Sequence, residues 1–419
     1  MKILHTSDWH LGKKLHQFDL LEDQRYFLQW LTDYINEQQI NLLLIAGDIF
    51  DTAHPPMGAQ ELYNNFLAQL FKANYPEKII ITDGNHDGRA NMRVPKSILK
   101  ALNIDVACQL EEELDDHIIT FQSGDETVLV GAIPFLRDQD LRKSVSDPTI
   151  EPEVAIRSGI ETIYANLAEK MTAQLAEAPK IAMGHLYTQG VKLEIPETEE
   201  GDQKVPDSER PIQMGHQASV NSSIFPATFD YVALGHIHLP QQISGPTEIH
   251  YSGAPYPLSF AERNYKSQCN LITIKGQKIQ AIDKIRIPVY RKFITLKGTL
   301  AEIKLKADQL ETFTAPSLIE VKLVEKEYDP LLRSRFDEWR EEFHQSQKHA
   351  IIVKSSIVFT HDSRDAQQLF QKHQINQQEF TAEKVFQARL ELAVDLDELT
   401  KKDVLEAFFT LAENTTKND

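Results

Sequence analysis

The sequence predicts a layered α/β fold, and three observations lead to this prediction. Residues 1 to about 285 alternate short apolar runs with amphipathic helical stretches, a pattern typical of layered α/β proteins. Five of the apolar runs end in small clusters of Asp, Asn or His, and open α/β folds place their sites at such strand ends. The length of 419 residues exceeds what one core usually holds, so we expect one large domain with smaller ones.

The elements of the first 285 residues follow from apolar spacing. Leu42–Ala46 is an unbroken apolar run of strand length, whereas Leu21–Gln38 repeats its apolar residues at helical spacing. By the same criteria, strands are predicted at 2–6, 42–46, 78–82, 128–133, 181–183, 231–234 and 270–274. Helices are predicted at 21–38, 61–71 and 94–102. The acidic residues 194–210 contain two prolines and predict an exposed loop.

The pattern changes after about residue 287 and predicts a small α+β domain. Its expected order is β-α-β-α-β, with strands at 293–296, 317–324 and 350–358 and helices at 300–310 and 330–344. Residues 363–380 are polar and Gln-rich, which predicts a linker. Two amphipathic helices follow at 383–393 and 400–413, and the second opens with the capping-box pattern Thr400-x-x-Asp403. The predicted domains are therefore 1–287, 288–362 and 363–419.

Charge and composition argue against several classes of protein, including membrane proteins and disulfide-rich proteins. The 62 acidic and 44 basic residues give a net charge of −18, which argues against tight binding of nucleic acid by the surface as a whole. Basic clusters near Lys13 and Arg89 follow site-type loops, although an ordinary solvated surface explains any one of them. The start lacks a signal-peptide pattern, no apolar run approaches the ~20 residues of a membrane span, and the two cysteines suggest no disulfide framework. We expect a cytoplasmic protein without membrane contact.

The five clusters supply side chains that bind divalent metal ions. Carboxylate, imidazole and amide oxygen suit Mn, Fe or Zn. Each cluster alone has an ordinary explanation as a cap or a surface group, but five strand ends of this kind indicate one shared site. The clusters are Asp8-Trp9-His10, Gly47-Asp48-Ile49-Phe50-Asp51, Gly84-Asn85-His86-Asp87, Gly184-His185 and Gly235-His236-Ile237-His238.

Paired metal ions would make this site a phosphoesterase centre. Two ions roughly 3.5–4 Å apart activate a bridging water and neutralise charge on a phosphoryl group. A carboxylate is the best bridging ligand, and we choose Asp48 because it is central in the set. His86 is next to Asn85, and histidine, with an ordinary pKa of about 6.5, can protonate a leaving oxygen. His16 and His54 lie near the site loops and receive no role.

The ordered set DxH, GDxxD, GNHD, GH and GHIH resembles the calcineurin-like metallophosphoesterase superfamily. The flanking residues 3–12, 46–52 and 233–238, and Tyr251-Ser252-Gly253 followed by Pro257-Leu258-Ser259-Phe260, resemble its DNA-repair nuclease branch. This resemblance implies a layered β-sandwich core flanked by helices. It also implies that residues 288–362 form a capping domain and that the helices of 363–419 dock on a partner.

The resemblance also implies the ligand sets and the activity. One metal ion would be held by Asp8, His10, Asp48 and His238, and the second by Asp48, Asn85, His185 and His236. His86 would act on the leaving group, and Asp51 stands where archaeal and eukaryotic relatives often carry a second catalytic histidine. The implied cofactor is manganese, and the implied action is 3′-to-5′ exonuclease and endonuclease cleavage of DNA, including duplex ends, hairpins and single strands.

Partners follow from the same resemblance. It implies a homodimer within a heterotetramer that contains a coiled-coil ATPase subunit, and this chain has no P-loop motif of its own. Terminal amphipathic helices also commonly pack on their own domain, and helices 61–71 and 94–102 either form a dimer bundle or simply cover the sheet. Two other functions stay open, namely a phosphatase or phosphodiesterase acting on a substrate other than DNA, and a scaffold without activity.

Overall fold

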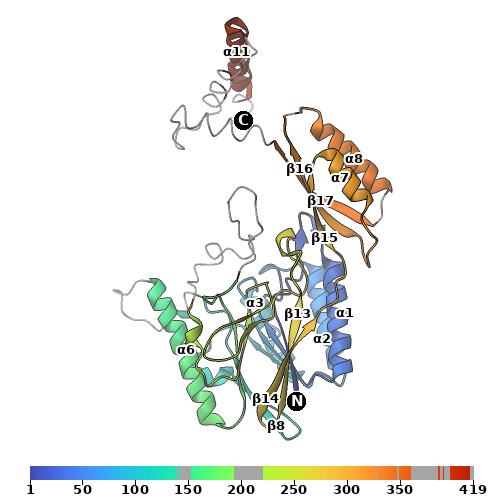
Figure 1. Cartoon of the computed structure of the whole chain (residues 1–419). Coiled ribbons are helices and arrows are strands. Elements are labelled where there is room, and N and C mark those ends of the chain that lie inside the picture. Colours follow the sequence, from blue (N-terminus) through green and yellow to red (C-terminus); the bar gives the residue numbers. More distant parts are fainter. Residues whose placement is uncertain are drawn as a thin grey trace. The chain divides into compact units, whose positions relative to one another are not determined.

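The computed structural model of the chain describes residues 1–137, 140–141, 152–192, 220–327, 329–346, 349–359, 386, 390 and 397–415. The predicted loop 194–210, the linker 363–380 and nearly all of the predicted helix 383–393 lie outside the described residues. The chain divides into two compact units, of which the first is Met1–Ile294 with Glu311–Glu320 and Lys348–Val353, and the second is the remainder from Thr295 onward (Figure 1).

Two six-stranded sheets form the centre of the first unit. The first sheet has the order β14-β13-β1-β4-β5-β6, with β1 Lys2–Thr6, β4 Leu42–Ala46, β5 Lys78–Thr82, β6 Ile104–Ala107, β13 Gln268–Lys275 and β14 Lys278–Arg286. The second has the order β11-β12-β10-β9-β8-β7, with β7 Ile118–Ser123, β8 Glu126–Ala132, β9 Lys180–His185, β10 Tyr231–Gly235, β11 Gln241–Ile243 and β12 Ile249–Tyr251. Strands β1, β4, β5 and β6 run parallel, as do β8, β9, β10 and β12.

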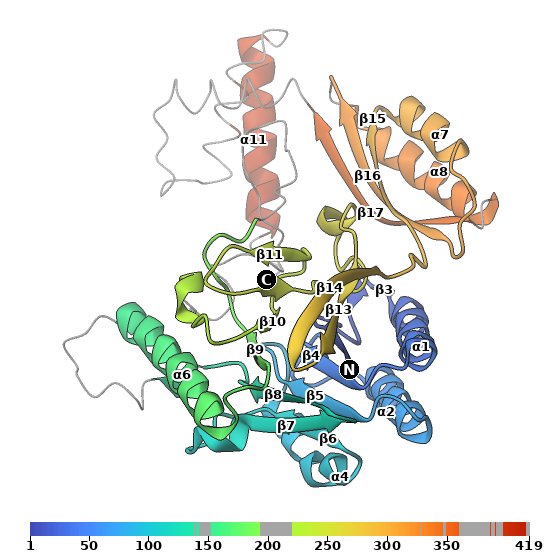
Figure 2. The same ribbon diagram turned by 60° about the horizontal axis from the view of Figure 1, so that its bottom comes forward.

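The two sheets pack face to face and are covered by helices on their outer faces. Leu44 and Ile80 of the first sheet share one buried cluster with Val130, Ile181 and Tyr231 of the second. Helices α1 (Leu21–Gln38) and α2 (Met57–Lys72) cover the first sheet, and α6 (Pro152–Gln174) covers the second (Figure 2). Both faces of β4 are therefore buried, which explains its unbroken apolar sequence. The predicted layered α/β fold with a helix-flanked β-sandwich core is confirmed.

Most predicted elements are present, and the differences have local causes. The predicted helix 94–102 is confirmed as the shorter α4 (Lys96–Ala101), which begins directly after Pro95, and the short helix α3 (Arg89–Arg93) before it was not predicted. Proline has no N–H to continue the helical hydrogen bonds. Helix α2 begins at Met57, directly after Pro56, rather than at residue 61. The elements α6, β6, β7, β11, β12 and β14 were not predicted from apolar spacing.

The later residues follow the predicted order of strands and helices. A three-stranded sheet has the order β15-β16-β17, and two helices lie between its strands in sequence. The elements are β15 Phe293–Gly298, α7 Leu300–Asp308, β16 Ser317–Glu325, α8 Leu332–Ser346 and β17 Ala350–Phe359. Helix α11 (Glu398–Thr415) confirms the predicted helix 400–413. The remaining elements are β2 Lys14–Leu15, β3 Phe18–Asp19 and the 3₁₀ turns η1 Leu114–His117, η3 Ser222–Ile224 and η4 Phe260–Glu262.

A membrane-spanning helix is not found in the described part of the chain, since none of its helices is both long and apolar enough.

Candidate metal centre

The structure brings all seven predicted ligands and His86 to the carboxyl ends of five strands. Parallel β1, β4 and β5 end in the loops of the first three clusters, and parallel β9 and β10 end in the two Gly-His clusters. Three overlapping groups each have ligand atoms within 4.8 Å of one another. These groups are Asp8 with His10 and His238, His10 with Asp48 and His86, and Asp8 with Asp48 and His185.

Several of these residues have positive φ angles, which orient their side chains toward the site. Asp8, His10, Asp48 and His236 have φ angles of 55°, 45°, 50° and 94°, and such conformations cost of order 1–3 kcal/mol each for residues other than glycine. A Cβ atom on Gly84 would collide with the carboxylate of Asp48. Glycine before the site residue therefore permits the close approach predicted from the sequence. Strain at four of the predicted ligand positions is typical of a functional site.

The predicted second ligand set converges on a single point. Asn85 Oδ1 lies 2.9 Å from His236 Nδ1 and 3.1 Å from His185 Nε2. Asp48 Oδ2 lies 3.2 Å from the same His185 nitrogen. His185 Nδ1 donates to the carbonyl of Ala46 at 2.9 Å, so Nε2 is the ring nitrogen that faces the other donors.

The predicted first set converges beside it and shares one atom. Asp48 Oδ2 lies 3.5 Å from His10 Nε2, and His10 and His238 place their ring centres 5.0 Å apart. The remaining oxygen of Asp48, Oδ1, accepts from the backbone N–H of His86 at 2.9 Å. One carboxylate oxygen, Asp48 Oδ2, thus faces donors of both sets, as the bridging position requires.

Electrostatics show that this cluster fits a cation. Burial disfavours the charged form of Asp48, but His185 and His10 lower its pKa well below the ordinary value. Burial likewise opposes protonation of His185, and Asp48 outweighs it and raises the pKa of His185 to about 9. His10 Nε2 is buried with no hydrogen-bond partner among the described residues. Positive charge is therefore stabilised at this point, and a donor atom is available there.

His86 is held in a different way from the ligands. Its Nδ1 donates to the backbone carbonyl of Asp51 at 2.8 Å, so Nε2 is the ring nitrogen that this bond leaves for the predicted proton transfer. Its ring centre lies 4.8 Å from that of His10, and the side chain is partly exposed. The ring therefore borders the metal donors and is still accessible from solvent, as an acid for a leaving oxygen must be.

Comparison with known proteins identifies the family. Residues 1–240 match the calcineurin-like phosphoesterase family. The chain is 33% identical over 322 residues to SbcD, a subunit of the nuclease SbcCD, from Rhodobacter capsulatus, covering 74% of this chain and 76% of that protein. The SbcD proteins of Escherichia coli K12 and Bacillus subtilis are each 29% identical, over 98% and 89% of this chain and 97% and 90% of their own lengths.

The chain is a calcineurin-like phosphoesterase of the SbcD family. This membership confirms the resemblance found from the strand-end motifs and their flanking residues. The family and the convergent donors together indicate divalent metal ions as cofactors.

Two buried acids of this phosphoesterase were not identified from the sequence. Asp87 accepts from the N–H groups of Gly84, Ile49 and Phe50 at 2.9–3.2 Å, which joins the loop after β5 to the loop after β4. Asp83 Oδ1 accepts from Phe135 N–H at 2.9 Å, and its Oδ2 has no hydrogen-bond partner among the described residues. The GNHD motif itself contains Asp87 and could have signalled it, whereas no local pattern signals Asp83.

We expect Asp83 to make the stability of this phosphoesterase depend on pH. Burial and the neighbouring Asp87 raise its pKa from 3.8 to about 7. Between these values the folded state binds a proton that the unfolded state has lost, so this group's contribution to stability falls as pH rises. Asp83→Asn removes this titrating group. We therefore expect the change that it causes in the free energy of unfolding to be more stabilising at pH 8 than at pH 4, by up to about 4 kcal/mol. Urea unfolding of the metal-free protein at several pH values measures this, and a pH-independent difference would contradict it.

Two basic residues that follow site loops are paired within the chain. Lys13 Nζ lies 3.1 Å from Asp51 Oδ1. The Arg89 guanidinium donates to both carboxylate oxygens of Asp140 and to the carbonyl of Phe135. These contacts hold loops around the phosphoesterase site, so Arg89 is a structural residue here rather than a free phosphate contact.

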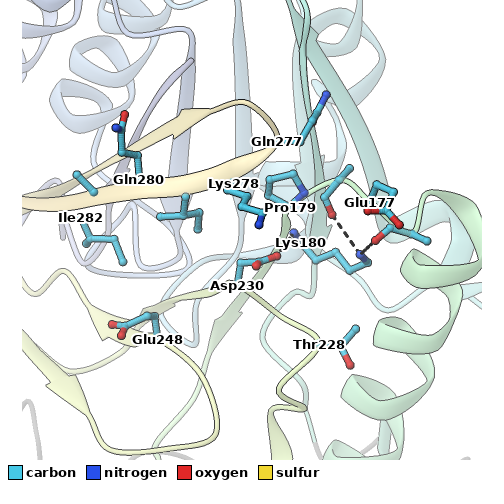
Figure 3. Close-up of a pocket in the computed structure, with 14 residues that line it drawn as sticks. Glu177, Pro179, Lys180, Thr228, Asp230, Glu248, Gln277, Lys278, Gln280 and Ile282 are labelled. Carbon is cyan, nitrogen blue, oxygen red and sulfur yellow. Dashed lines mark hydrogen bonds between the residues drawn. The ribbon is translucent and has the colours of Figure 1, made fainter.

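A hollow of about 670 Å³ lies at the amino ends of β9 and β10, whereas the metal donors follow their carboxyl ends. Figure 3 shows the residues that line it. Lys180, Asp230 and Glu248 are among its lining residues. The Lys180 ammonium donates to the carbonyls of Ala176 and Ala178 at 2.7 and 3.1 Å, and Asp230 accepts from Lys180 N–H at 2.8 Å. Lys180 and Asp230 therefore stabilise the turn that follows α6. We assign the hollow no part in phosphoester chemistry.

Proposed function

We propose that this chain is a DNA nuclease subunit that hydrolyses phosphodiester bonds with two divalent metal ions, for which Mn²⁺ is the best candidate. The observation that carries the proposal is the pair of donor sets that meet at Asp48 Oδ2. Relatives described as nuclease subunits match it over most of its length, which supports DNA over a phosphoprotein, a cyclic nucleotide or a small phosphomonoester. The proposed action is 3′-to-5′ exonuclease and endonuclease cleavage, including hairpins. A scaffold without activity is disfavoured because every predicted donor is present.

The residues have separate proposed roles. Asp8, His10, Asp48 and His238 form the first metal site, and Asp48, Asn85, His185 and His236 form the second. When bound, the ions would activate a water molecule and neutralise charge on the phosphoryl oxygens. Asp48 fixes the two sites relative to each other. The Nδ1–H bond to the Asp51 carbonyl orients the His86 ring, and in its doubly protonated form His86 would deliver the Nε2 proton to the leaving 3′ or 5′ oxygen.

The proposed assembly divides the chain by task. Residues 1–287 carry catalysis, 288–362 form the capping domain, and the helices of 363–419 dock on an SbcC-type ATPase, which supplies the ATP-driven step. A homodimer is supported by apolar side chains that are exposed in the single chain, with Val94 before α4 81% and Ile98 within α4 67% exposed. A net charge of −18 supports the view that the partner provides part of the DNA-binding surface. The proposed location of the complex is the bacterial cytoplasm.

A substrate comparison tests this function. We expect the purified chain with Mn²⁺ to degrade linear duplex, hairpin and single-stranded DNA faster than a phosphopeptide, a cyclic nucleotide or p-nitrophenyl phosphate. Adding the ATPase partner with ATP should increase the rate on duplex ends, and a chelator should abolish every activity. Rapid hydrolysis of a phosphomonoester, together with intact DNA under all these conditions, would contradict the proposal.

A further inference from the structure

The segment Ser252–Glu262 contacts two of the three loops that supply the first donor set, namely those after β1 and β10. Ser252 Oγ lies 2.7 Å from Ser7 Oγ, and Ser7 Oγ donates to Asp8 Oδ2. The Tyr256 hydroxyl donates to the carbonyl of Trp9, the residue between Asp8 and His10. This segment contains Ser252-Gly253 of the Tyr-Ser-Gly motif and the whole Pro-Leu-Ser-Phe motif, which the assignment of metal ligands leaves without a role.

The same segment holds His238 at two points. The N–H of Ala254 donates to the carbonyl of His238 at 3.0 Å. Glu262 Oε1 lies 3.3 Å from His238 Nδ1. Gly253, with φ of 77°, permits this close approach, because a Cβ atom there would lie 2.6 Å from the His238 carbonyl oxygen. Both the backbone and the ring of His238 are therefore tied to one segment.

Burial and several hydrogen bonds fix the side chain of Glu262 beside His238. Its side chain is completely buried at the end of turn η4. Oε2 accepts from Leu258 N–H at 2.8 Å, and Oε1 also accepts from the Ser259 hydroxyl at 3.1 Å. A buried carboxylate is costly unless it is hydrogen-bonded, and these donors satisfy it. Because a carboxylate only accepts, His238 Nδ1 must carry the hydrogen, and in this neutral form Nε2 carries the lone pair that a metal ligand needs.

We propose that Glu262 is a positioning residue for the first metal site: it selects the Nδ1–H form of His238, fixes the ring, and adds negative charge behind this ligand. The inference rests on the proposed function because it takes His238 as a ligand. Carboxylates that hydrogen-bond metal-bound histidines raise their basicity and orient them. His185 of the second site instead donates to the neutral carbonyl of Ala46. The effect of Glu262 is therefore confined to one of the two sites.

Calorimetric titration of the metal-free full-length protein with Mn²⁺ tests the inference. We expect Glu262→Ala to weaken one of the two binding sites by roughly 10- to 100-fold and to leave the other unchanged. Glu262→Gln keeps an acceptor for His238 Nδ1–H without the charge, so it should recover part of the lost affinity. A purely structural role would instead lower the thermal stability and both affinities together.

A matched control uses another glutamate–histidine pair. Glu248 Oε2 lies 3.0 Å from His250 Nε2, and neither residue belongs to a donor set. Glu248→Gln should leave both Mn²⁺ affinities unchanged. Unchanged binding at both sites in both Glu262 variants overturns the inference alone, whereas a wild-type protein that binds no Mn²⁺ overturns the proposed function as well.

The wild-type protein provides a second measurement that does not depend on folding of the Glu262 variants. NMR of the metal-free chain labelled with ¹⁵N-histidine, with His238 assigned from the spectrum of His238→Gln, should show the Nδ1–H form. The Nε2–H form at His238 would overturn the inference.

Discussion

Asp48→Asn is expected to lower kcat for DNA cleavage by roughly 10³-fold or more, because several kcal/mol of charge stabilisation depend on the bridging ligand. Asparagine keeps the size of the side chain and an oxygen that can accept from His86 N–H, as Asp48 Oδ1 does at 2.9 Å. It removes the charge of the oxygen that faces His10 and His185. The measurement is the initial rate on linear duplex DNA at saturating Mn²⁺, together with Mn²⁺ stoichiometry.

The exposed acid Asp125, in the turn between β7 and β8, provides the control for this variant. Asp125→Ala should keep the wild-type rate and stoichiometry, and circular dichroism should show that both variants fold. Wild-type cleavage by Asp48→Asn would contradict both the bridging role and the proposed function.

His86→Ala should lower kcat on DNA by about 10²–10⁴-fold while both metal ions remain bound. His86 lies beside the donors but is fixed by the Asp51 carbonyl, so its loss removes a proton source and no ligand. A p-nitrophenyl phosphodiester has a leaving group that needs no proton. The loss of rate on that substrate should therefore be much smaller than the loss on DNA, and comparison of the two kcat ratios measures this role.

Two further variants serve as controls for His86→Ala. His10→Ala removes a donor and should lower the rate on both substrates along with Mn²⁺ binding. His54→Ala, which changes an exposed histidine on the neighbouring loop, should retain kcat. An equal loss on DNA and on the activated phosphodiester in His86→Ala would show that His86 does not act as the acid.

Local sequence determined seven of the twelve strands described in the two sheets, and the chemical type of the site. Leu42–Ala46 is apolar at every position because both faces of β4 are covered, so a strand was predictable from composition alone. The spacing of Phe27, Leu31 and Ile35 predicted α1 with its observed bounds. Helix α6 was also within reach, since Ile156, Ile160, Ile163 and Leu167 have helical spacing. Three-residue strands such as β11 and β12 are too short for any periodicity to identify them.

Residue identity alone also pointed to the metal donors, because few side chains can bind a divalent ion and glycine must precede them where backbones come close. Which atoms meet was decided by the tertiary structure. The place of Asp48 Oδ2 between His10 and His185 depends on the approach of three separate strand ends. The contact of Glu262 with His238 spans 24 positions along the chain. Such contacts arise where segments distant in sequence fold against each other, and no local pattern encodes them.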